Sequence, residues 1–208
     1  MSSKMLTPLR SLDGVRLHSG ADLPLIDKLA QISGIYLPSD HRAALCESNG
    51  AEVYGGYLRL FGVGVDENIE AIKWNDLDFW KFAWEDRCSG YWCFAETAWG
   101  DQYAYGISAL NNNVSNIYLL DCLSMMPTLV ASSFSEFLEN EFIRSARDPY
   151  DVMMKQARKI LGDIQVEEHL IYVPSPLLGG SEDIANVRKM DARSAMICNG
   201  DIATQLDA

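Results

Sequence analysis

Residues 91–106 read YWCFAETAWGDQYAYG, and this stretch decides the fold class of the chain. Aromatic residues fill both halves of it, as they do on the pleated, half-buried surface of a β-sheet. Gly100 and Asp101 separate the two halves, and glycine supplies the positive φ that a tight hairpin turn requires. The stretch therefore predicts a β-hairpin packed in a sheet, and nothing in it resembles a catalytic motif.

Two helices are predicted before the hairpin. Asp22 as N-cap, with Pro24 in the first turn, predicts a helix that ends near Gly34. Ser39 is expected to cap a second helix from Asp40 to about Ser48, which Asn49-Gly50 terminates. N-terminal to both helices, residues 1–20 have no sustained hydrophobic period and predict an irregular lead-in.

Strand signals lie on both sides of the hairpin. Alternating residues predict strands at 57–61 and 117–120, and residues 69–74 predict a short strand or turn. Ser133 and Glu136 have the spacing of a capping box, which predicts a helix that starts there.

The C-terminal third has its own set of signals. Asp148 and Pro149 predict the start of a third major helix, which ends at Gly162. A strand is predicted at residues 169–173 and a short helix near 182–188. Asn199-Gly200 is a strong turn signal, so residues 194–206 predict a second hairpin.

These signals predict an α+β protein with a twisted, mostly antiparallel sheet backed by helices. Residues 1–21 are expected to form an N-terminal tail and residues 22–147 the main domain. Residues 148–208 are expected to form a small helix-hairpin extension. The second boundary rests on composition, because all five Trp and all seven Phe lie before residue 148.

The chain has 208 residues and a net charge of −12. Nucleic acids and anionic membrane surfaces select patches of Lys and Arg, so this charge argues against both as partners. It favours solubility and attraction to basic partners; in the alternative interpretation the charge has no special meaning, because many cytoplasmic proteins are simply acidic. The N-terminus lacks the apolar core of a signal peptide, and no apolar run approaches membrane-spanning length, so a cytoplasmic protein is expected. The sequence leaves the oligomeric state open.

The five cysteines form an odd set without a CxxC pair, which predicts reduced and mostly buried thiols. The three histidines, His18, His41 and His169, form no cluster with metal-ligand spacing. Neither a metal nor a cofactor is expected.

Three stretches, in this order, resemble the SUKH superfamily, which is named for its link to a yeast cell-wall synthesis regulator. Residues 37–41 and 46–50 read LPSDH and CESNG, similar to the family's LPxDY…NGG opening motif. Residues 94–103 read FAETAWGDQY, similar to its FAxxGxGDxYxx hairpin, with Trp99, Gly100 and Asp101 at the turn. Residues 133–138 read SFSEFL, similar to its closing helix. The resemblance covers residues 22–145. The chain departs from the pattern at Trp99, where the family varies between a small and an aromatic residue, and in a long aromatic and acidic insert before the hairpin.

The C-terminal third carries a second resemblance. Residues 172–180 read YVPSPLLGG and residues 186–190 read NVRKM. These runs resemble the FVPALxLGG…ENLxKV signature of a C-terminal module in type VI secretion immunity proteins.

The resemblances imply a binding protein. Many bacterial SUKH members are cytoplasmic immunity proteins that neutralise a polymorphic toxin by occluding its active site, and others are regarded as scaffolds. The family pattern holds no catalytic residue, so a protein partner is implied and enzymatic activity is not. Two hypotheses follow: an immunity protein that covers a basic toxin domain, and an intracellular scaffold or regulator of envelope or cell-wall assembly.

An acidic and aromatic stretch at residues 66–86 is the candidate partner-binding surface. Tryptophans can anchor an interface while carboxylates steer a basic partner. In the alternative interpretation, the aromatics belong to the core and the acids form their solvated face. The candidate residues are Asp66, Glu67, Trp74, Asp76, Asp78, Trp80, Trp84, Glu85 and Asp86.

Two catalytic hypotheses are weaker alternatives. Glu96, Asp101 and Asp121 could approach one another if the hairpin packs beside residues 117–121, and paired carboxylates can hydrolyse glycosides. Acids at turns and strand ends are, however, common as turn formers. A nucleophilic Cys93 or Cys198 would need a positioned histidine base, and no histidine of the sequence has such a context.

Overall fold

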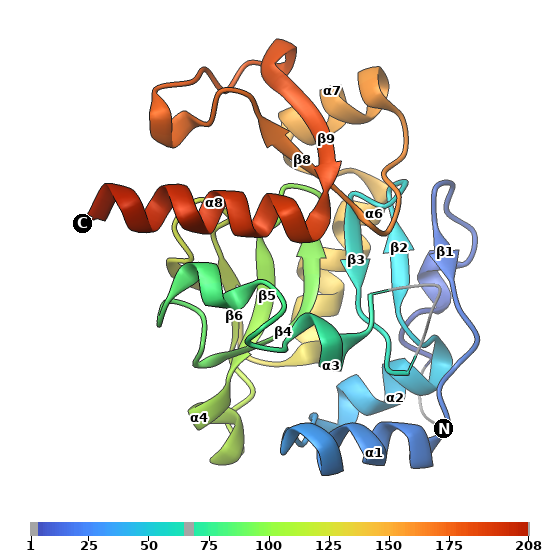
Figure 1. Cartoon of the computed structure of the whole chain (residues 1–208). Helices are drawn as coiled ribbons and strands as arrows, with labels where there is room; N and C mark the ends of the chain where they lie inside the picture. Colours follow the sequence, from blue (N-terminus) through green and yellow to red (C-terminus); the bar gives the residue numbers. More distant parts are fainter. Residues whose placement is uncertain (1–3, 65–68, 208) are drawn as a thin grey trace.

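A computed structural model describes residues 4–64 and 69–207 of the chain. Within them, seven strands form one antiparallel sheet whose order follows the sequence from β1 to β7 (Figure 1). The strands are β1 (Arg16–Leu17), β2 (Ala51–Val53), β3 (Leu58–Leu60), β4 (Tyr91–Thr97), β5 (Gln102–Gly106), β6 (Ile117–Leu120) and β7 (Pro127–Ala131). The predicted α+β fold with an antiparallel sheet is confirmed.

The stretch at residues 91–106 forms the hairpin β4–β5 at the centre of this sheet, as predicted. The two strands pair along their length, with a bulge after Cys93. Gly100 lies in the turn with φ +93°, a backbone angle that residues with a side chain rarely adopt. A Cβ atom at Gly100 would lie only 3.2 Å from Nδ1 of His169, so the glycine also lets a distant segment pack against the turn.

Helices with buried phenylalanines cover one face of the sheet. α5 (Phe134–Phe137), the π-helical η3 (Leu138–Ile143) and α6 (Arg144–Arg147) follow one another on that face, behind the sheet in Figure 1. The ring of Phe137 lies 5.2 Å from that of Phe94 in β4. Ser133 caps α5 by accepting a hydrogen bond from the N–H of Glu136, as predicted, while the Glu136 carboxylate binds Ser132.

Two helices lie beyond one end of the strands: α1 (Leu23–Ser33) and α2 (Ser39–Glu47) (Figure 1). Asp22 caps α1, as predicted. Ser39 does not cap α2; the helix begins at Ser39 itself. The neighbouring Asp40 carboxylate instead accepts hydrogen bonds from the N–H and hydroxyl of Ser135, both at 2.9 Å, and so joins α2 to α5.

The segment that precedes the hairpin covers the opposite face of the sheet. It contains α3 (Ala71–Trp74) and the 3₁₀ turn η2 (Lys81–Trp84), where the sequence predicted a short strand or turn at 69–74. The Asn75 side chain accepts a hydrogen bond from the N–H of Cys93 at 2.7 Å and donates one to its carbonyl at 2.6 Å. These bonds attach the segment to β4, at the bulge.

Residues 148–207 form an addition at the end of the sheet opposite α1 and α2, and the last helix of this addition crosses the second face (Figure 1). Its elements are α7 (Val152–Leu161), β8 (Glu168–Tyr172), the 3₁₀ turns η4 (Pro176–Leu178) and η5 (Ile184–Asn186), β9 (Val187–Asp191) and α8 (Ala192–Asp207). α7 begins later than predicted, with Asp151 as its cap in place of Asp148. β8 and β9 form a separate two-stranded sheet, and α8 runs across the molecule in front of the main sheet (Figure 1).

The prediction of a hairpin at residues 194–206 is wrong, because this region is the helix α8. Asp191 accepts hydrogen bonds from the N–H and hydroxyl of Ser194 at 2.8 and 2.6 Å, which is the arrangement of a helix cap. Gly200 serves close packing: a Cβ atom there would lie 2.7 Å from the carbonyl oxygen of Ala83 in η2. Helical spacing places Ala195, Met196, Asn199 and Ala203 on the buried side of α8.

The described residues before α1 take part in the core. β1 pairs with β2, and the side chains of Leu6 and Leu9 are fully buried. The Glu47 carboxylate accepts hydrogen bonds from the N–H groups of Met5 and Leu6. The remaining short elements are η1 (Thr7–Leu9) and α4 (Ile107–Asn111). Over the described residues, no helix is both long enough and apolar enough to cross a membrane.

Candidate functional site

A buried ionic network joins the main sheet to the C-terminal addition. Its members are Arg59 in β3, Glu96 in β4 and His169 in β8, and all three side chains are fully buried. Arg59 Nη1 lies 3.0 Å from Glu96 Oε1, and His169 Nε2 lies 3.1 Å from Glu96 Oε2. One carboxylate therefore faces two cationic or protonatable groups that come from both parts of the chain.

Further hydrogen bonds extend the network. Arg59 donates to the carbonyl oxygens of Gln165 and Glu168, which lead into β8. Gln102 Nε2 donates to Glu96 Oε2 at 3.2 Å. Burial by itself would raise the pKa of Glu96, but His169, Arg59 and Gln102 together hold it below its ordinary value. Glu96 is thus a buried structural carboxylate, which is the opposite of what a general acid in a glycosidase needs.

A cavity of about 380 Å³ opens beside this network, where the hairpin turn meets the C-terminal addition. The hairpin contributes Trp99 and Asp101, which belong to the first family motif. The addition contributes Tyr172, Ser175 and Pro176, which belong to the second. The stretches that carry the two family resemblances in the sequence therefore converge on one site, which we call the junction pocket.

Two stacked rings form part of the wall of the junction pocket. The centroids of Trp99 and Tyr172 lie 5.1 Å apart, and the ring planes differ by 7°. Burial, with Glu182 and Asp151 nearby, raises the pKa of Tyr172 to about 12, so the phenol is neutral at physiological pH. The outer faces of such a pair can attract a cation.

Four carboxylates line the same pocket: Asp101, Asp121, Asp151 and Glu182. Among the described residues that line it, none is Lys or Arg. A site with four acids, an aromatic wall and no Lys or Arg among its described lining residues has the chemistry to receive a guanidinium or ammonium group.

Three of these acids also have structural roles. Asp101 accepts hydrogen bonds from Thr97 Oγ1 at 2.8 Å and from the N–H of Cys122 at 2.9 Å. Burial nevertheless raises the pKa of Asp101, and the nearby Asp121 adds to this effect. Asp121 accepts hydrogen bonds from the turn that follows it, and Asp151 caps α7. Glu182 is exposed and forms no hydrogen bond or ion pair with any residue that the structure describes.

The residues proposed as a binding surface at 66–86 divide into two groups. Trp74 is 5% exposed, and Trp80 and Trp84 are 0% exposed, so these tryptophans belong to the core. The acids Asp76, Asp78, Glu85 and Asp86 are exposed. This is the arrangement of the alternative interpretation, with aromatics inside and acids on the solvated face. Asp66 and Glu67 lie outside the described residues.

The other candidate nucleophiles and ligands do not form a site. Cys93 is fully buried, and burial raises the pKa of its thiol. Cys198 is exposed on α8. Over residues 4–64 and 69–207, no group of three or more His, Cys, Asp or Glu side chains could hold a metal ion.

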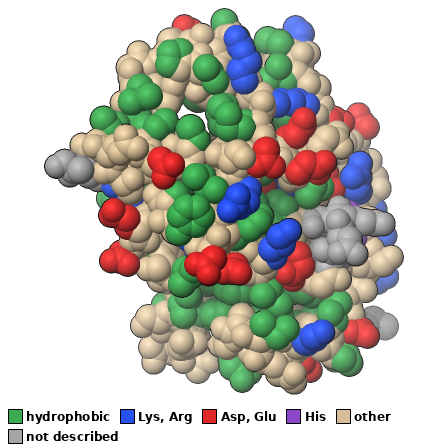
Figure 2. Space-filling model, viewed as in Figure 1, with side chains coloured by type: hydrophobic (Ala, Val, Ile, Leu, Met, Phe, Trp, Pro, Cys, Tyr) green, Lys and Arg blue, Asp and Glu red, His purple; other side chains and the backbone are tan. Residues whose placement is uncertain are grey.

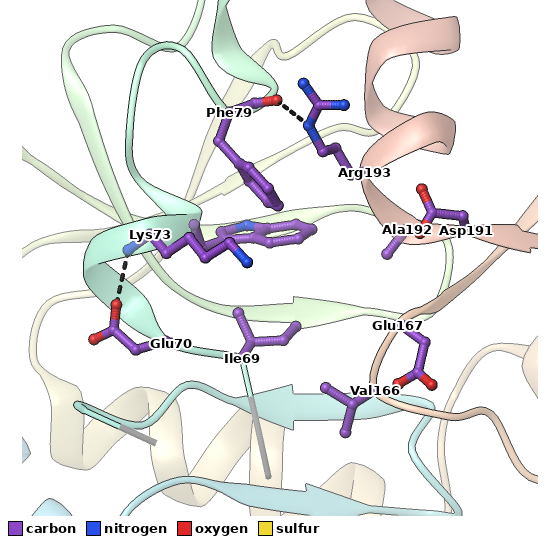
Figure 3. Close-up of a pocket in the computed structure, with 10 residues that line it drawn as sticks. Ile69, Glu70, Lys73, Phe79, Val166, Glu167, Asp191, Ala192 and Arg193 are labelled. Carbon is purple, nitrogen blue, oxygen red and sulfur yellow. Dashed lines mark hydrogen bonds between the residues drawn. The ribbon is translucent and has the colours of Figure 1, made fainter. Parts of the chain in front are cut away.

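A second cleft, of about 350 Å³, lies between α3 and the start of α8 (Figure 3). Figure 3 shows Glu70 and Lys73 on one side of it, Glu167 and Asp191 on the other, and Arg193 beside Phe79. On the face that Figure 2 shows, acidic and basic side chains also lie near one another, around apolar ones. This cleft thus differs from the junction pocket, which has no basic side chain among its described residues.

The fold class of the chain is an α+β antiparallel meander with helices on both faces of the sheet. The crystal structure of Atu4351 from Agrobacterium tumefaciens shares this fold, with a TM-score of 0.62, at 13% identity, over 94% of this chain and 88% of that chain. Coverage of 94% requires that most of residues 148–208 match as well, so the C-terminal addition belongs to the shared architecture.

The family model of the SMI1/KNR4 family (SUKH-1) matches residues 20–140. The chain therefore belongs to this family, as the opening, hairpin and helix motifs predicted. A comparison with curated proteins finds no match.

Proposed function

We propose that this chain is a non-catalytic immunity-type protein that neutralises a bacterial toxin by covering the toxin's active site. The junction pocket carries the proposal, because it combines four carboxylates with stacked aromatic rings and has no basic side chain among its described residues. Membership of the SUKH-1 family supports the class of function. The net charge of −12 supports a basic partner.

The proposed mechanism is occlusion. Enzymes that act on anionic substrates line their active sites with Lys and Arg, and the negative field of this chain would steer such a site toward the junction pocket. One basic side chain of the toxin would then enter the pocket against the rings of Trp99 and Tyr172, with Glu182 at the rim. The exposed acids Asp76 and Glu85 are the alternative contact surface. Five free thiols are consistent with action in the reducing cytoplasm.

Affinity capture of the tagged protein from its native cells tests the proposal. The expected result is one stoichiometric partner that is toxic when expressed alone and harmless when expressed together with this chain. Absence of protection on co-expression would contradict the immunity function.

A scaffold or regulator of envelope assembly is the second candidate. The observation in its favour is that two clefts of different charge character exist on one chain, which suits two different partners. This function predicts several substoichiometric envelope proteins in the same capture experiment.

A further inference from the structure

The cleft between α3 and α8 has an apolar floor. Ile69, Trp74 and Ala192 contribute to it, and each of these residues is at most 6% exposed; the partly buried Val166 adds to it. Trp74 Nε1 donates a hydrogen bond to Gln102 Oε1 at 2.8 Å, so the only polar atom of the indole is satisfied inside the core. The part of the floor that Trp74 contributes is therefore purely apolar, and it suits a large hydrophobic side chain.

Two cations border this floor on either side of one ring. Lys73 Nζ lies 5.2 Å and Arg193 Cζ 5.3 Å from the centroid of the Phe79 ring. Arg193 Nε donates to the carbonyl oxygen of Phe79 at 2.6 Å, which fixes the guanidinium at the rim and leaves its terminal amino groups available. The ammonium group of Lys73 has no hydrogen-bond or ion-pair partner in the described part of the chain.

Two of the three acids at the rim are already in use. Glu70 accepts hydrogen bonds from the N–H groups of Lys73 and Gly64 at the start of α3. Asp191 is the cap of α8, and hydrogen bonds from Ser194 hold its pKa below the ordinary value. The exposed Glu167 has no side-chain hydrogen bond among the described residues. The groups at the rim that remain free to bind a ligand are thus mainly hydrogen-bond donors, on Lys73 and Arg193. Glu167 is the one free acceptor among the described rim residues, and it lies on the side opposite Lys73.

We propose that this cleft binds the C-terminal residue of a polypeptide partner, one with a large apolar side chain. The side chain would cover the Trp74 floor, the terminal carboxylate would bind Lys73 with the charge of Arg193 adding to the attraction, and the last peptide N–H would donate to Glu167. These three groups are the three that a chain terminus carries together. The proposal rests on the proposed function only in taking the partner to be a protein.

Small probes test the chemistry of this cleft directly. N-acetyl-L-phenylalanine carries the apolar side chain, the carboxylate and the N–H, and N-acetyl-L-phenylalaninamide differs in lacking the charge. Titration into the full chain, followed by the assigned Trp74 indole N–H signal in nitrogen-15 NMR spectra, should give saturable binding of the acid. The amide should bind about two- to fivefold more weakly, as expected for loss of an exposed charge pair.

A matched pair of variants assigns the effect. Lys73→Gln should reduce the preference for the acid over the amide, whereas Lys28→Gln, which changes an exposed lysine of α1, should leave it unchanged. Equal binding of acid and amide, tighter binding of the cationic phenylalaninamide, or no shift of the Trp74 signal would each overturn the proposal. These outcomes are independent of toxin neutralisation, which is measured without the probes.

Discussion

His169 Nε2 lies 3.1 Å from Glu96 Oε2, and both side chains are fully buried. This contact joins the C-terminal addition to the centre of the family domain. Arg59 donates hydrogen bonds to the same carboxylate and to two backbone carbonyls at β8. A substitution of Arg59, Glu96 or His169 should therefore disturb both the main sheet and the C-terminal addition. Residues 148–207 are therefore a structural part of the domain, and the junction pocket depends on their position.

The Glu96→Gln variant should lose about 3–5 kcal/mol of unfolding free energy, since Arg59 would keep a buried charge without its counter-ion. Urea denaturation measures this loss. Asp78→Asn is the control, because the Asp78 side chain is exposed, and it should change stability by less than about 0.5 kcal/mol. Equal stability of Glu96→Gln and the wild type would show that the network contributes little.

Stability should fall as the pH decreases from about 7 to 5. Burial lowers the pKa of His41 from 6.5 to about 3, so the folded chain keeps the ring neutral while the unfolded chain takes up a proton below pH 6.5. The stabilising effect of the neutral ring is thus complete above pH 6.5 and is lost at about 1.4 kcal/mol per pH unit below it.

The His41→Phe variant assigns this pH dependence. The His41 ring stacks on Phe134 at 4.1 Å, which a phenyl ring can reproduce. Its melting temperature should depend less on pH between 7 and 5 than that of the wild type. The lowered pKa of Glu96 acts in another window, since its contribution is present above about pH 4.5 and is lost only at lower pH. A slope unchanged by His41→Phe would contradict the assignment.

The Gly200→Ala variant tests the packing of α8. In an exposed helix interior this change would stabilise by about 1 kcal/mol. Here a Cβ atom would meet the Ala83 carbonyl at 2.7 Å, so a loss of about 1–3 kcal/mol is expected in thermal denaturation. Asp201→Ala, at the exposed neighbouring position of the same helix, is the control and should be near neutral. A stabilised Gly200→Ala chain would contradict the close approach of α8 to η2.

Association with the captured partner should depend strongly on salt. A protein with net charge −12 and a basic partner attract each other over long distances, and ions screen this attraction. The association rate constant should fall about tenfold when ionic strength rises from about 0.05 to 0.5 M, whereas the dissociation rate constant should change less. Stopped-flow fluorescence measures both, and a salt-independent association rate would exclude electrostatic steering.

The sequence predicted those parts of the fold whose signals are local. Alternation and a turn glycine defined the central hairpin, and Asp22 defined the start of α1. Four short strands were missed, β1, β2, β7 and β9, because two to five residues give too little alternation to detect. The turn signal at Asn199-Gly200 led to the wrong prediction of a hairpin. Gly200 is present because the helix packs closely on Ala83, which is distant in the sequence.

Sequence patterns did not predict the junction pocket. Its acids come from four separate segments, and Asp151 and Glu182 carry no local sign of a shared site. Trp99 and Tyr172 belong to separate family resemblances, and only the structure brings the two rings together. The acids and tryptophans of residues 66–86 are adjacent in the sequence, which favoured a binding surface there, yet Trp74, Trp80 and Trp84 are buried in the structure.

The most direct test of the account is the dissociation constant of the captured partner for three chains: wild type, Glu182→Lys, and the double variant Asp76→Lys with Glu85→Lys. Glu182 forms no contact that the fold needs within the described residues, so its variant changes the junction pocket without disturbing the core. The account predicts that Glu182→Lys weakens binding about tenfold or more, while the double variant stays within about twofold of the wild type. Unchanged affinity of Glu182→Lys, with a loss in the double variant, would contradict the junction pocket and return the binding surface to the acidic stretch before the hairpin.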